Sequence, residues 1–201
     1  DEANWELITR LNRDLRDSAA LMDRSEARYL VDLYYQIQEQ RQRSASQTRS
    51  STDATDPSNT PEPSALTGWL FDQFRILEGD IKRALGVYAS SHIPGIWSQS
   101  IHGIGPVISA GLLCHIDVNP WKCHGTKPKD RCSPTSPHAG LGCGHIVVNT
   151  AGGVWRFAGL DPTLKWEKKT KRPFNAKLKV LVWKIGESFV KVSNNDNDVY
   201  G

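Results

Sequence analysis

The segment 100–116, SIHGIGPVISAGLLCHI, constrains the fold more than any other part of the chain, because a Gly-Ile-Gly-Pro turn leads directly into an apolar run. Gly103 and Gly105 permit positive φ and let another backbone approach closely, and Pro106 presets the first turn of a helix. The N–H groups of that first turn have no acceptor within the helix, and the helix dipole makes this end positive. The sequence therefore predicts a small anion site that a phosphate can reach.

This segment also has the pattern of a helix-hairpin-helix, in which two helices flank a glycine turn. We expect the first helix over 96–101 and the second over 106–115, with Ala110 as the small residue that packs on the partner helix. Such hairpins hold a nucleic-acid backbone without reading its bases. The candidate binding residues of the turn are Gly103, Ile104, Gly105 and Val107. The alternative is a glycine-rich turn between helices that binds nothing.

Charge is distributed unevenly along the 201 residues, although the net charge is only +3. Residues 1–80 hold nine arginines against fifteen acids, whereas residues 81–201 hold sixteen basic residues against seven acids. The C-terminal half is therefore the expected anion-binding half, and the acidic half is expected to face solvent or a protein partner. Because no apolar run approaches the ~20 residues of a membrane span, and no signal-peptide core is visible, the sequence indicates a soluble intracellular protein without a membrane partner.

The N-terminal half reads as helices. Apolar residues recur at spacings of three and four over about 4–20 and from about 25 into the forties, which predicts an N-terminal helical pair over 1–49. Beyond Gln38 the pattern fades into a polar stretch that we expect to lose its order, with its arginines Arg41, Arg43 and Arg49 solvated. Residues 50–63 are rich in Ser, Thr, Asp and Pro and read as a linker.

A long helix is predicted from 64 to about 90, and together with the glycine hairpin it forms a segment over 64–118. The helix carries an apolar stripe of Leu66, Leu70, Phe74, Leu77, Ile81, Leu85 and Tyr88. The stripe fits packing against the first two helices. It fits equally well an N-terminal arm through which the chain forms a homo-oligomer.

Residues 119–149 form an insert dense in Pro, Gly, Cys and His, too long for a structureless loop unless something holds it. A tetrahedral zinc ion accepts four N or S ligands and supplies folding free energy. The candidate ligands, separated by eight, five and four residues, are Cys123, Cys132, His138 and Cys143. His124 and His145 are further imidazoles, and a loop of unliganded thiols and histidines is the alternative. The fourth cysteine, Cys114, reads as a buried thiol that only packs.

The segment 150–201 completes the chain with a short helix ended by Gly159, an Asp161-Pro162 turn and a basic helical end. Between residues 165 and 191 there are nine Lys and Arg and two Glu, interleaved with Trp166, Phe174 and Trp183. Cations hold phosphates and aromatic rings stack on bases, so this composition favours a nucleic-acid surface. The candidate phosphate contacts are Lys165, Lys168, Lys169, Lys171 and Arg172. Trp183 lies in a helix with a core stripe, so a core position is open for it as well.

In order along the chain, GIGPVISAGLL, a variable stretch, FAGLDP and a basic terminal helix resemble the C-terminal domain of the insertion-sequence transposases described as bridge-RNA-guided recombinases. The resemblance covers about 95–192 and implies a phage or mobile-element DNA-binding protein in the cytoplasm of a prokaryotic or phage-infected cell. The first 94 residues lack a counterpart of the family's acidic nuclease-like domain. The stretch 163–167, TLKWE, lacks its catalytic serine.

These observations predict a mainly α fold, a helical assembly with a helix-hairpin-helix and an irregular, zinc-bound insert. The expected function is backbone-directed binding of DNA or RNA, without catalytic residues. A transposase or recombinase enzyme, or its accessory subunit, is one alternative, with Thr163 as the only nucleophile near the family's serine position. A structural or assembly protein is the other.

Overall fold

The structure is a computed structural model that describes residues 13–52, 65–116, 121–123, 146–148 and 150–193. It is mainly helical, as the sequence predicts, and divides into two compact units, Asp1–Cys114 and His115–Gly201. The first unit holds α1 (Arg13–Ala20), α2 (Arg24–Thr52), α3 (Ala65–Ser90), α4 (Ile93–Gln99) and most of α5 (Pro106–His115). None of the helices within these ranges is both long and apolar enough to cross a membrane.

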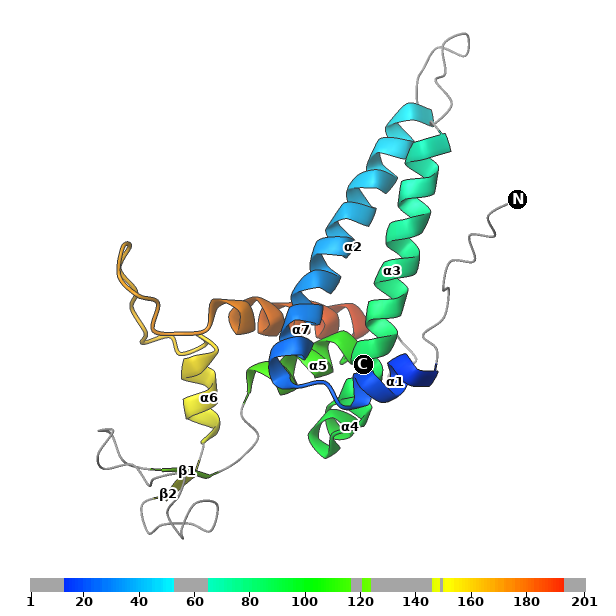
Figure 1. Ribbon diagram of the computed structural model, residues 1–201. Helices are drawn as coiled ribbons and strands as arrows, with labels where there is room; N and C mark the ends of the chain where they lie inside the picture. Colours follow the sequence, from blue (N-terminus) through cyan, green and yellow to red (C-terminus); the bar gives the residue numbers. More distant parts are fainter. Residues whose placement is uncertain (1–12, 53–64, 117–120, 124–145, 149, 194–201) are drawn as a thin grey trace. The chain divides into compact units, whose positions relative to one another are not determined.

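The core of the first unit joins α2, α3 and α5. Helices α2 and α3 run side by side in opposite directions, and α1 packs against α3 (Figure 1). Leu85 and Tyr88 of α3 are almost completely buried, and burying such side chains stabilises the fold by roughly 1.5–3 kcal/mol each. The other core members are Ala27, Val31, Tyr34, Ile81, Ala89, Val107, Ala110, Leu113 and Cys114. The second half of the predicted α3 stripe is therefore core, as is Ala110.

Helix α2 extends beyond the predicted loss of order and continues to Thr52. Its polar part gains stability from α3, because Arg41 forms an ion pair with Glu78 and Gln38 donates to the same carboxylate at 3.2 Å. Arg43 pairs with Glu39 one turn earlier at 2.5 Å. The expectation of a fraying end was wrong because Gln, Glu and Arg are good helix formers that also find partners here. The predicted linker begins within this helix, and its remainder, 53–63, lies outside the described residues.

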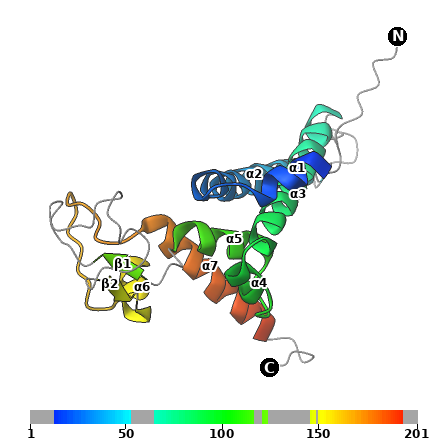
Figure 2. The same ribbon diagram turned by 60° about the horizontal axis from the view of Figure 1, so that its bottom comes forward.

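The glycine turn is flanked by α4, which packs against the end of α3, and by α5, which contributes side chains to the same core as α3 (Figure 2). Helix α4 begins at Ile93, three residues before the predicted start, because His92 is extended and Pro94 occupies the first turn. It ends at Gln99, and α5 begins at Pro106 as predicted. A Cβ on Gly95 would lie 2.0 Å from the carbonyl oxygen of Ala89, so only glycine lets α4 approach α3 this closely.

The second unit contains β1 (Trp121–Cys123), β2 (Ile146–Val148), α6 (Ala151–Phe157) and α7 (Ala176–Ser193). The strands were not predicted; they pair antiparallel, with Cys123 opposite Ile146. Helix α6 is capped by Thr150, whose side chain accepts from the N–H of Gly153 at 3.2 Å. It ends at Phe157 with Ala158 as its C-cap, and Gly159 follows with φ +70°, which stops the helix as the sequence predicts.

Candidate nucleic-acid interface

The glycine turn in the first unit is built by two glycines with different roles. Gly103 has φ 91°, which favours glycine, whereas Gly105 is exposed and does not adopt positive φ. A Cβ added to Gly105 would meet no heavy atom within 4 Å. The backbone at Gly105 is therefore open to the approach of another molecule.

The candidate amides of this turn are not equivalent. The N–H of Ile104 donates to the carbonyl of Ile101 at 3.0 Å, and the Ile104 side chain is buried, so Ile104 supports the turn rather than offering an amide. The carbonyl of Gly105 accepts from Ser109 at 2.9 Å and starts α5. Val107 lies in the first turn of α5, where the helix supplies no acceptor for its N–H, while its side chain is in the core. Among the predicted binding residues of this turn, Gly105 and Val107 are thus the ones whose amides remain candidates for an anion.

A buried serine pair fixes the two helices around this turn. Ser98 Oγ and Ser109 Oγ lie 2.6 Å apart, and they lie 3.0 and 3.2 Å from the carbonyl oxygen of Gly95. One serine donates its proton to the other, whose own hydroxyl then donates to the carbonyl of Gly95. Because both serines are nearly inaccessible to solvent, this network is satisfied within the protein. The turn is therefore held from both of its helices.

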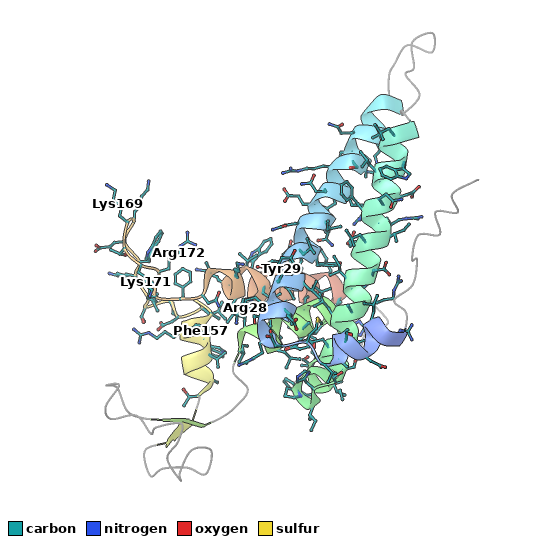
Figure 3. All side chains as sticks on the ribbon, in the orientation of Figure 1. Arg28, Tyr29, Phe157, Lys169, Lys171 and Arg172 are labelled. Carbon is teal, nitrogen blue, oxygen red and sulfur yellow. The ribbon has the colours of Figure 1, made fainter. Side chains whose placement is uncertain are left out.

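Two arginines of α2 cap the other end of α5, a role that the sequence analysis missed. Arg28 donates to the carbonyl of Cys114 at 2.7 Å, and Arg24 donates to the carbonyl of Leu113 through two nitrogens at 3.2 and 3.3 Å. Cations at a helix C-terminus satisfy its last carbonyls and oppose the helix dipole. Figure 3 labels Arg28 near the start of α2. These charges serve the fold rather than a ligand.

The second unit presents its cations on the loop between α6 and α7, residues 158–175, here named the basic loop. Its ends are joined, because the N–H of Asn175 donates to the carbonyl of Phe157 at 2.8 Å. The ring of Phe174 packs on Gly159 so closely that a Cβ added to this glycine would lie 2.9 Å from the ring carbons. The two ends of the basic loop are therefore held together at the start of α7 and the end of α6.

All five predicted phosphate contacts lie on the basic loop and are exposed. They are Lys165, Lys168, Lys169, Lys171 and Arg172. Figure 3 shows Lys169 at the outer end of the loop, followed by Lys171 and Arg172. Lys169 has φ 81°, which is costly for a residue with a Cβ. Within the described residues, no carboxylate forms an ion pair with any of the five.

The arginines of α2 and α3 behave differently, because several of them are neutralised by neighbouring acids. Their ion pairs are Arg41–Glu78, Arg43–Glu39, Arg75–Asp72 and Arg83–Asp80. Arg41 was expected to be solvated, but it is partly buried against Glu78, whereas Arg43 is exposed and pairs with Glu39. Unpaired positive charge is therefore a property of the basic loop rather than of every basic segment.

Aromatic rings accompany these cations. The guanidinium of Arg172 lies 5.1 Å from the ring centre of Trp166, and Lys179 Nζ lies 4.9 Å from that of Phe174. Trp183 is 64% exposed, which places it on the surface and not in the core. Only Leu178 and Leu181 of α7 are buried among the described residues of this helix.

Thr163 lies in a turn at the start of the basic loop. Its hydroxyl and its N–H donate to Asp161 Oδ1, at 2.6 and 2.9 Å. The hydrogen bond from the Thr163 side chain, and then that from its backbone, lower the pKa of Asp161 below the usual value. A carboxylate with a lowered pKa is a weak general base. The hydrogen bonds between Asp161 and Thr163 therefore stabilise the turn and do not activate the hydroxyl.

The predicted zinc ligands lie mostly outside the described residues. Cys123 ends β1, whereas Cys132, His138 and Cys143, together with the further imidazoles His124 and His145, fall within 124–145, which is not described. Cys114 is a free, buried thiol, as predicted, and burial raises its pKa to about 11. Such a thiol stays protonated at neutral pH and is chemically inert.

The chain thus has two surfaces with groups that attract anions, one in each unit. The first unit presents exposed backbone at Gly105 and the N-terminus of α5, and the second presents the basic loop with its aromatic neighbours. Both suit a polyanion more than a neutral or cationic ligand. No protein-family model, curated protein or solved structure matches the sequence.

Proposed function

We propose that this chain is a non-enzymatic nucleic-acid-binding protein that holds the phosphate backbone of DNA largely without regard to sequence. The observation that carries the proposal is the basic loop, on which five exposed cations stand on a fixed base without an ion-pair partner among the described carboxylates. Self-repelling charge of this kind is costly in the free protein and becomes favourable when phosphates replace the counterions.

The glycine turn supports the same proposal. We assign to it the role of a helix-hairpin-helix, in which the amides of Gly105 and Val107 bind one phosphate at the positive end of α5. A Cβ placed on Gly105 would meet no heavy atom within 4 Å, which supports the approach of a ligand at this position. The transposase-like order of motifs around it fits a role in DNA recombination or in a mobile element, in the cytoplasm of a prokaryotic or phage-infected cell.

Salt dependence tests the phosphate contacts directly. If all five cations of the basic loop neutralise phosphates, the logarithm of the binding constant falls against the logarithm of salt with a slope of about −3.5 on single strands or −4.5 on duplex, from ~0.7 or ~0.9 per contact. Replacing Lys168 and Lys171 by Gln makes this slope less steep by the contribution of about two phosphate contacts. Lys82→Gln on the exposed side of α3 removes a charge elsewhere and is the matched control. Binding that hardly changes between low and high salt contradicts the proposal.

An enzyme of the transposase or recombinase class is the alternative that the family resemblance supplies. Incubation with supercoiled or branched DNA and a divalent metal distinguishes it from the proposed function. We expect neither nicking nor joining, because the Thr163 hydroxyl is engaged by a weakly basic Asp161. Strand cleavage that disappears in Thr163→Ala would establish the enzyme instead.

Assembly through the N-terminal helices is favoured by a specific observation on α3. Leu66 and Leu70 of the predicted stripe are 65% and 38% exposed and do not enter the core, and the nearby Trp69 is 55% exposed. Contiguous exposed apolar side chains often mark a protein contact. We propose that this half of α3 forms a homo-oligomer, which light scattering tests: Trp69→Glu should yield a monomer, and a wild-type monomer contradicts the idea.

A further inference from the structure

The second unit has an open hollow of about 410 Å³ between the basic loop and the first half of α7. We name it the aromatic hollow. The aromatic and basic residues that line it are Trp166, Arg172, Phe174, Lys179 and Trp183. The volume lies within the range of small-ligand sites, which bury flat and partly apolar groups. The hollow is thus large enough for a nucleobase with its sugar.

The rings of the aromatic hollow are held for contact rather than buried. Trp166 is 40% exposed, and its indole N–H donates to the carbonyl of Thr170 at 3.0 Å, so its polar edge is satisfied and its ring orientation is set. Trp183 stands one turn beyond Lys179 on α7 and is 64% exposed. Trp166 therefore loses little entropy when a ligand binds, because its position is already defined.

The cations define the charge of the ligand. Arg172 already lies over the face of Trp166 at 5.1 Å, and Lys179 lies over Phe174 at 4.9 Å. Arg172 covers one face of Trp166, whereas Trp183 lines the hollow and is 64% exposed, so Trp183 offers the more accessible ring for stacking. A ligand that uses both features is flat where it meets Trp183 and anionic where it meets Arg172 and Lys179.

We infer that the aromatic hollow binds an unpaired base of a single-stranded nucleic acid, stacked on Trp183, while Arg172 and Lys179 contact the adjoining phosphates. This inference rests on the proposed function and deepens it, because it names the strand state of the ligand. In a duplex the base faces are covered by their neighbours, and exposing one requires unstacking. Base–aromatic stacking is tolerant of sequence, which agrees with backbone-directed binding.

The test uses the full chain with three fluorescently labelled probes of equal length: oligothymidylate, the same sugar–phosphate chain without bases, and a duplex. We expect oligothymidylate to bind at least about tenfold more tightly than the abasic chain, since one stacked base contributes roughly a factor of five to 150. Trp183→Ala should remove most of that difference, and Trp183→Phe should retain it. An oligouridylate probe distinguishes RNA from DNA as the source of the base, and its affinity should also depend on Trp183.

Trp155→Ala is the matched control, because Trp155 is 62% exposed on α6 of the same unit and does not line the hollow. Alanine favours the helix in both variants, so circular dichroism and melting temperature should be unchanged. Equal binding of the three probes with a steep salt slope refutes the hollow and leaves the phosphate-binding function standing. Failure of all three probes to bind refutes both. Equal losses in Trp183→Ala and Trp155→Ala also refute the assignment of the base to this hollow.

Discussion

Gly105→Ala separates a glycine required by the fold from one required by a ligand. The added Cβ meets no heavy atom within 4 Å and the residue does not need positive φ, so no strain results. Alanine is poorer than glycine before the first turn of a helix, by roughly 0.5–1 kcal/mol, but it restricts the unfolded chain by a similar ~0.4–1 kcal/mol. The free energy of unfolding should therefore change by no more than about 0.5 kcal/mol.

Binding should change far more than stability. A methyl group at this position separates a phosphate from the amides of Gly105 and Val107, and a charge-assisted hydrogen bond contributes about 1.5–3 kcal/mol. The dissociation constant for a labelled oligonucleotide, measured by fluorescence anisotropy, should therefore rise about ten- to one-hundredfold. Urea unfolding of the same sample reports the stability.

Two further glycine variants make this measurement decisive. Gly68→Ala on α3 also adds a Cβ in open space and should leave binding unchanged. Gly103→Ala places a side chain at φ 91° and should lower the free energy of unfolding by roughly 1–2 kcal/mol, because a residue with a Cβ is strained in this conformation. If Gly105→Ala binds within twofold of the wild type, the turn is not a phosphate site, and the helix-hairpin-helix role is refuted.

Three other expectations follow from named contacts. Lys169→Gly should leave the melting temperature unchanged or slightly higher, because relief of ~1–2 kcal/mol of backbone strain at φ 81° offsets the flexibility of glycine. The salt dependence of binding should become less steep by about 0.7, and a lower melting temperature contradicts the expectation. Arg28→Met should destabilise the first unit by about 1 kcal/mol in urea unfolding, because the carbonyl of Cys114 loses its 2.7 Å donor, whereas Arg43→Met should have a smaller effect. Metal analysis should find about one zinc per chain that is lost in Cys132→Ser, and a metal-free wild type ends the zinc hypothesis.

Local signals in the sequence predicted the helices that carry their own start and stop residues. Pro106 marks the first turn of α5, and Gly159, with φ +70°, stops α6 after Phe157. The polar part of α2 lacked such signals, because its stability depends on Glu78, which lies on α3, 37 residues from its partner Arg41. Arg28 was missed for the same reason: its acceptor at Cys114 is 86 residues away. Contacts of this range leave no pattern in a local window.

The candidate site divides along the same line. The five cations of the basic loop could be chosen from composition alone, because a dense basic run with two acids has few other uses than binding an anion. The roles of Gly103, Ile104 and Gly105 could not be separated before their φ angles and hydrogen bonds were known. Two helices flank the turn as the sequence predicts, whereas its role as a phosphate site stays a prediction.

Trp183 shows why the second unit needed its structure most. Helix α7 carries apolar residues on more than one side, since Leu178 and Leu181 are buried while Val180, Trp183 and Val190 are 54%, 64% and 63% exposed. Each set has helical spacing, so periodicity cannot decide which set forms the core. The return of the basic loop decides it here, because Phe174 packs at Gly159 and leaves a hollow beside Trp183. An apolar face that stays exposed next to unpaired cations is costly in the free protein, and a stacked base with its phosphates removes both costs together.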